Sequence, residues 1–77
     1  MKDSIADVTL HLDENTTHDE REKIRDKLLE LAGAVAAARH DERPHLIVIG
    51  YDPEVVNSIE FVNTAKNNGY HAELVGI

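Results

Sequence analysis

The chain has 77 residues, a net charge of −7 and no cysteine. A chain of this length lies near the lower limit for folding without disulfides or metals, so residues 1–77 are expected to form a single domain. Without cysteine the protein has no disulfide bonds, no thiolate metal sites and no thiol nucleophiles.

The charge balance and the hydropathy limit which classes of molecule the protein is expected to bind. Only eight Lys and Arg residues occur, whereas nucleic-acid binding depends on clusters of basic side chains. No apolar run is long enough for a membrane-spanning helix, and residues 1–7 contain no hydrophobic signal region. We therefore expect a soluble, cytoplasmic protein that binds neither nucleic acid nor membrane.

The first half of the chain begins with strand periodicity and then changes to helical periodicity. Val8, Leu10 and Leu12 alternate with polar residues, which predicts a half-buried strand. From Thr17 onward apolar residues recur at helical spacing, which predicts a helix that ends at Gly33. The apolar stripe of this helix contains Ile24, Leu28 and Leu31.

The second half alternates between strand and helix patterns. Residues 35–41 predict a weak strand because alanine packs little surface, and residues 41–44 resemble a turn. Residues 45–51 form a clear strand pattern, 57–68 a second helix and 70–75 a last strand. The apolar residues of the second helix are Ile59, Phe61, Val62 and Ala65, and Asn57 and Glu60 have the spacing of a capping pair. The order β-α-β-β-α-β predicts an α+β, ferredoxin-like sandwich: a four-stranded antiparallel sheet with two helices on one face.

The C-terminal stretch from Tyr51 to Val75 closely resembles the end of heavy-metal-associated domains, the modules of copper chaperones and metal ATPases. In that family a strand ends in Tyr-Asp-Pro, as at residues 51–53, and the second helix is followed by Gly-Tyr, as at residues 69–70. Gly33 and the two residues after it take the place of the family's Gly-Val. The resemblance implies the same ferredoxin-like fold.

The same resemblance fails at the family's metal site. The family carries Met-x-Cys-x-x-Cys between its first strand and first helix, and its two cysteines align with Thr17 and Glu20. A hydroxyl and a carboxylate do not replace two soft thiolates, so transfer of a thiophilic ion is not expected here. Thr17 and Glu20 instead have the spacing of a helix capping box.

The histidines are predicted to lie towards one pole of the fold. In this topology the first and third connections and the loop after the second helix lie at the same end of the sheet, the end that holds the metal in the family. All five histidines, His11, His18, His40, His45 and His71, occur beside those connections. With Asp13 and Glu14 they could bind Zn(II), Ni(II) or Cu(II). The simpler explanation is that histidine is polar and favours loops and strand ends. A pH-sensitive patch is a third interpretation.

The sequence therefore predicts a non-enzymatic binding module, with no bound cofactor, that contacts another protein or a second copy of itself. The alternative is a metal-handling protein that uses the weak candidate ligands His11, His18, His71, Asp13 and Glu14. Strand alternation places Leu46 and Val48 on the helix-free face of the sheet, together with His11 and His71. This face is the predicted interaction surface.

Overall fold

The computed structural model describes residues 5–40 and 42–75, and it has the predicted order of elements. These are β1 (Ala6–Leu12), α1 (His18–Leu29), β2 (Ala34–His40), β3 (Arg43–Tyr51), α2 (Ile59–Asn67) and β4 (Ala72–Val75). The four strands form one antiparallel sheet in the order β2-β3-β1-β4. The predicted α+β, ferredoxin-like fold is therefore confirmed.

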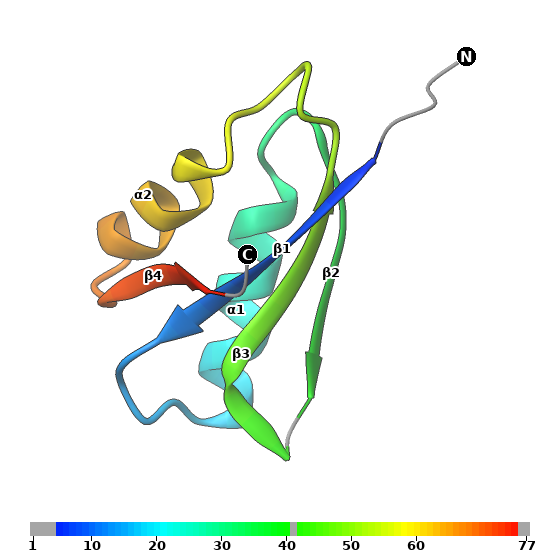
Figure 1. The fold of residues 1–77 in the computed structure, drawn as a ribbon. Helices are drawn as coiled ribbons and strands as arrows, with labels where there is room; N and C mark the ends of the chain where they lie inside the picture. The colour runs from blue at the N-terminus through cyan, green and yellow to red at the C-terminus, as the bar shows by residue number, and fades with distance from the viewer. Residues whose placement is uncertain (1–4, 41, 76–77) are drawn as a thin grey trace.

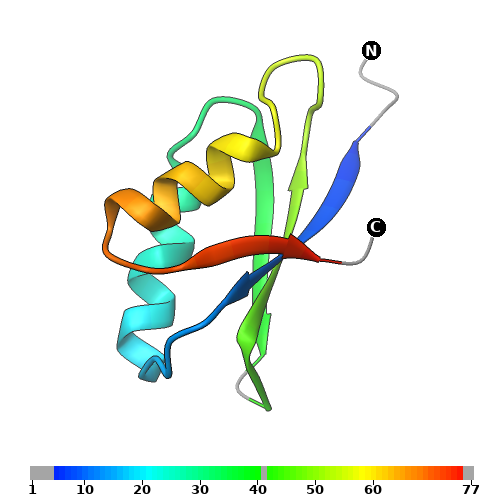
Figure 2. The same cartoon turned by 60° about the vertical axis from the view of Figure 1, so that its left-hand side comes forward.

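Both helices cover the same face of the sheet, and the other face carries no helix (Figure 1, Figure 2). The core lies between these layers because the two central strands alternate. Leu10 and Leu12 of β1 and Ile47 and Ile49 of β3 are fully buried, and they pack with the fully buried Leu28 and Phe61 of the helices. Phe61 also meets the ring of Tyr51 edge-on, with ring centroids 5.3 Å apart.

The first helix is shorter than predicted. It ends at Leu29, with Glu30 as its C-cap, so Leu31 lies beyond it. The N–H groups of Glu30 and Leu31 donate to carbonyls three residues back, which tightens and closes the last turn. Gly33, predicted as the helix end, instead lies in the connection to β2 with a φ of +94°.

That connection lies very close to the loop between β3 and α2. The N–H of Asp52 donates to the carbonyl of Gly33 over 2.8 Å. A Cβ atom on Gly33 would lie 2.9 Å from side-chain atoms of both Val55 and Val56. Only a residue without a side chain fits this crossing.

The second helix begins two residues later than predicted. Ser58 is its N-cap and makes no side-chain capping bond, while the side chain of Asn57 accepts from the N–H of Ile59 over 3.1 Å. The predicted pairing of Asn57 with Glu60 is thus replaced by a shorter turn before the helix. Ile59, one of the apolar residues of this helix, is 49% exposed because it occupies the first helical turn, away from the core.

The strands β2 and β3 form a tight hairpin. β3 begins at Arg43, so Arg43 and Pro44 belong to the strand instead of the predicted turn; Asp41 lies outside the described residues. The pairing of β2 with β3 shifts register twice, between Ala34 and Ala36 and between Arg39 and His40. β2 is an edge strand in the sheet order, and its pairing is irregular at each end.

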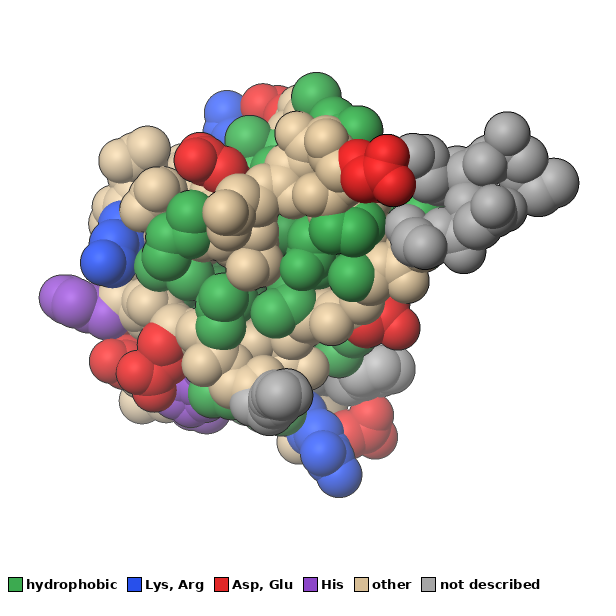
Figure 3. Space-filling view, turned by 45° about the horizontal axis from the view of Figure 1, so that its top comes forward, with side chains coloured by type: hydrophobic (Ala, Val, Ile, Leu, Met, Phe, Trp, Pro, Cys, Tyr) green, Lys and Arg blue, Asp and Glu red, His purple; other side chains and the backbone are tan. Residues whose placement is uncertain are grey.

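Exposed apolar side chains gather at the end of the molecule opposite the loop between β1 and α1. Val35 is the second residue of β2, Val55 lies between β3 and α2, and both are more than half exposed. Ile5 precedes β1 at this same end, and Ile59 begins α2 there. Figure 3 shows hydrophobic side chains clustered in the middle of the face turned this way. We call this end the apolar pole.

At the edge of the sheet, Leu74 of β4 is an exposed apolar side chain. Leu74 pairs with Leu10 and therefore faces the helix side, yet it is 36% exposed. Its edge position explains this exposure, since β4 is the outermost strand. Within residues 5–40 and 42–75, neither helix combines the length and apolarity needed to cross a membrane.

Candidate functional site: the loop after the first strand and its neighbours

The loop that joins β1 to α1 ends in a complete capping box. The hydroxyl of Thr17 accepts from the N–H of Glu20 over 3.2 Å, and the carboxylate of Glu20 accepts from the N–H of Thr17 over 2.8 Å. Two N–H groups at the start of the helix are thereby satisfied, as the sequence predicted.

The same loop is closed from two further sides. Arg21, which is buried, donates from Nη1 to the carbonyl of Thr16 over 2.6 Å. The N–H of Asp13 donates to the carbonyl of His71 over 2.9 Å, which extends the pairing of β1 with β4 beyond the strand ends. Residues 13–17 are thus held at both ends by hydrogen bonds.

A thiophilic ion such as Cu(I) does not fit this loop. The positions that align with the family's cysteines hold a hydroxyl and a carboxylate, both hard oxygen donors, and Cu(I) prefers thiolates. In addition, Thr17 Oγ1 and Glu20 Oε1 already accept backbone hydrogen bonds of the capping box. The loop therefore serves to start the helix.

The replacement Thr17→Ala is expected to destabilise the protein by about 1 kcal/mol, because it removes an N-cap hydroxyl. Thr17→Ser keeps the hydroxyl and is the matched control, with little expected change. Urea denaturation followed by circular dichroism measures both. An unchanged midpoint for Thr17→Ala would show that the cap contributes nothing to stability.

Two of the predicted ligands, His71 and Glu14, form a pair of their own. The carboxylate of Glu14 accepts from the backbone N–H of His71 over 2.9 and 3.0 Å and lies 2.5 Å from its Nδ1 atom. The side-chain hydrogen bond lowers the pKa of Glu14, helped by the backbone bond, and raises the pKa of His71. The pair ties the loop to His71, the residue before β4. Both carboxylate oxygens of Glu14 are engaged in these hydrogen bonds.

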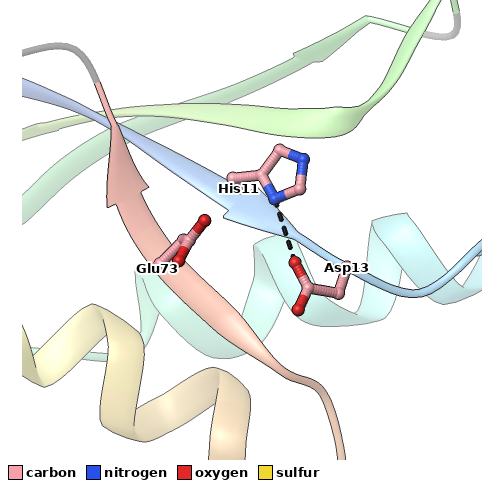
Figure 4. Close-up of side chains that lie close together, drawn as sticks. All are labelled: His11, Asp13 and Glu73. Carbon is pink, nitrogen blue, oxygen red and sulfur yellow. Dashed lines mark ion pairs between the residues drawn. The ribbon is translucent and has the colours of Figure 1, made fainter.

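A second cluster combines His11 and Asp13 with Glu73, which was not among the predicted ligands (Figure 4). His11 and Glu73 are directly opposite each other in the pairing of β1 with β4. Nδ1 of His11 lies 3.3 Å from Oδ1 of Asp13. One potential ligand atom from each of the three residues lies within 4.8 Å of the others.

The ring of His11 also stacks on a second histidine. The ring centroids of His11 and His45 are 5.6 Å apart and their planes differ by 18°. Nδ1 of His45 lies 2.7 Å from the carbonyl oxygen of Leu12, which holds the second ring in place. His18 is the first residue of α1 and lies outside both clusters, and the side chain of His40 falls outside the described part of the chain.

The helix-free face of the sheet carries a groove beside the stacked histidines. Its register places Val48 opposite Thr9 and Leu46 opposite His11, so all four share this face, as predicted for Leu46, Val48 and His11. Val48 is 38% exposed and Leu46 is half-buried. A groove of about 630 Å³ is lined by Thr9, Glu42, Arg43, Leu46 and Val48. We call these five residues the outer groove.

Sequence comparison finds no matching family model and no matching curated protein. Structural comparison does find similar folds. Oxidised MerP from Ralstonia metallidurans is 14% identical, with a TM-score of 0.85 over 95% of this chain and 100% of its own. The yeast copper transporter domain Ccc2a is 18% identical, with a TM-score of 0.80 over 91% and 94% of the two chains. A copper-binding domain of a P-type ATPase is 14% identical, with a TM-score of 0.82 over 91% and 93%.

These similarities agree with the resemblance found in the sequence. Each alignment covers nearly the whole length of both chains, so the likeness concerns the entire domain. At such low sequence identity the likeness establishes the fold alone. Because the chain contains no cysteine, it cannot form a thiolate metal site. The chain has the fold of heavy-metal-associated and MerP-type domains, without the cysteines with which the family binds its metal.

Proposed function

We propose that the chain is a non-enzymatic binding module that associates with a second copy of itself through the outer groove. The observation that carries the proposal is the groove itself, in which Leu46 and Val48 form an apolar centre on a sheet face that no helix covers. A sheet needs only one buried face to be stable, so apolar residues on the other face favour a contact surface. The polar groups of the loop after β1 are engaged in closing that loop, which favours binding over catalysis.

The charges at the rim of the outer groove suit a two-fold contact. Glu42 and Arg43 are adjacent, exposed and of opposite sign. In an isologous dimer each patch meets its own copy, so Arg43 of one copy can lie opposite Glu42 of the other. The net charge of −7 on each chain opposes association, and salt should weaken that repulsion.

The expected result is concentration-dependent association that Val48→Asp abolishes, because the new charge would be buried without a partner. Val35→Asp is the matched control: it places the same charge on a more exposed valine at the apolar pole and should leave association intact. Sedimentation and amide shifts during dilution, both in EDTA, measure the effect and locate the contact. A monomer at millimolar concentration, or loss of association in Val35→Asp alone, would refute the proposal.

A second candidate function is metal handling through histidine and carboxylate ligands. The observation that favours it is the approach of His11, Asp13 and Glu73 to one another. This function needs no thiolate, and nitrogen and oxygen donors suit divalent ions of the first transition row. A saturable zinc titration of the purified protein would support it.

A further inference from the structure

Backbone pairing fixes the positions of His11, Asp13 and Glu73 relative to one another, although Asp13 and Glu73 are exposed. His11 and Glu73 form a directly opposed pair across β1 and β4, a position that keeps two Cβ atoms roughly 5 Å apart. Asp13 follows β1, and its N–H bond to His71 continues the ladder to this point. All three side chains therefore project from one paired stretch of backbone, which Figure 4 shows at the ends of β1 and β4.

The imidazole of His11 is held with one nitrogen towards the carboxylates. Its Nδ1 atom is enclosed and has no hydrogen-bond partner among the described residues, although Oδ1 of Asp13 lies 3.3 Å away. The stack on His45 restrains the plane of the ring. An enclosed ring nitrogen without a partner costs free energy, and in the neutral tautomer whose Nδ1 carries the lone pair the neighbouring carboxylate adds repulsion.

A cation placed between these three side chains would relieve both costs. We propose that Nδ1 of His11 and the carboxylates of Asp13 and Glu73 bind a divalent transition-metal ion of the zinc class. This inference rests on the second candidate function above and names its ligands. The site differs from the loop positions of Thr17 and Glu20, whose oxygens serve the capping box.

The donor set selects the class of ion. One imidazole nitrogen and two carboxylate oxygens suit Zn(II), Co(II), Ni(II) and Cu(II), and three protein ligands leave a coordination position for water. Mg(II) and Ca(II) prefer sites made of oxygen alone, and Cu(I) prefers sulfur. The two carboxylates also balance the charge of a divalent ion.

The pair formed by His71 and Glu14, which lies at the same end of the sheet as this cluster, provides the matched control. Glu14 already accepts hydrogen bonds from the N–H and the ring of His71, so it is not part of the proposed ligand set. Glu14→Gln and Glu73→Gln each remove one carboxylate charge from the same region. Only Glu73→Gln removes a ligand.

Calorimetric titration with zinc chloride tests the inference on the whole chain. Wild-type protein is expected to bind one zinc ion with saturation, Glu73→Gln to bind at least about tenfold more weakly, and Glu14→Gln to bind as wild type. An excess of Mg(II) should not displace the zinc. An amide correlation spectrum of each variant confirms that it is folded, and the largest shifts on zinc addition should fall on His11, Asp13 and Glu73.

Two results would overturn the ligand set while leaving metal handling in place: equal weakening in both variants, or loss of binding in Glu14→Gln alone. Absence of saturable zinc binding to the wild-type protein would overturn the metal-handling function together with the ligand set. Displacement of zinc by Mg(II) at comparable concentration would reduce the cluster to a non-selective acidic surface, and would also refute the inference.

Discussion

Wild-type protein is expected to lose Cu(I) completely to a chromogenic Cu(I) chelator, whereas the double variant Thr17→Cys, Glu20→Cys is expected to retain it. The reason is donor chemistry, because Cu(I) prefers thiolates and the natural chain contains none. The two substituted positions flank the start of α1, where the positive end of the helix dipole favours anionic ligands. The difference in Cu(I) affinity between the two proteins should span several orders of magnitude.

The single variant Thr17→Cys is the control for this experiment. One thiolate at the N-cap position cannot form the two-sulfur site, so its retention should remain far below that of the double variant. Competition is measured by the absorbance of the chelator complex under reducing, anaerobic conditions. Stoichiometric retention of Cu(I) by the wild-type protein would contradict the assignment of the loop as a helix cap alone.

Gly33→Ala is expected to be among the most destabilising single-methyl additions in this chain. The residue has a φ of +94°, a conformation that costs a residue with a side chain about 1–2 kcal/mol. The added Cβ would also lie 2.9 Å from the side chains of Val55 and Val56, and overpacking of this kind costs about 1–3 kcal/mol. The two effects together predict a loss of roughly 2–5 kcal/mol in the free energy of unfolding.

Gly69→Ala separates the two contributions. Gly69 has the same φ of +94°, but an added Cβ there would meet nothing within 4 Å. The control variant should therefore lose only the backbone part, about 1–2 kcal/mol. Chemical denaturation of both variants gives the comparison. Equal losses at the two glycines would show that the loops around Gly33 move apart without cost.

The fold could be predicted because periodicity and turn residues pointed in one direction. The alternation of Val8, Leu10 and Leu12 gives the first strand one apolar face, and the structure buries Leu10 and Leu12 completely, together with Ile47 and Ile49 of the neighbouring strand. The capping box was equally predictable, since it depends on residues three apart. Element ends were less so: Ile59 fits a helical stripe, yet its place in the first turn leaves it exposed.

The candidate site was only partly predictable. Sequence placed His11 and Asp13 near one pole, but it also grouped them with Glu14 and His71, which form a separate pair. Glu73 was missed as a ligand because its relation to His11 depends on strand register, and a strand of only four residues gives little information about register. If the start of β4 at Ala72 had been known, counting residues back from the expected strand end could have indicated Glu73.

The two register shifts in β2 affect how copies of this protein meet in concentrated solution. An edge strand with small side chains, such as Ala36 and Ala38, exposes its main-chain amides to any extended segment that approaches. Irregular pairing generally bends and twists a strand, so the register shifts at both ends of β2 are expected to shorten the straight stretch that a second strand could join. Growth of the sheet from molecule to molecule, the first step of fibre formation, is thereby disfavoured at the side where the alanine-rich sequence would otherwise invite it.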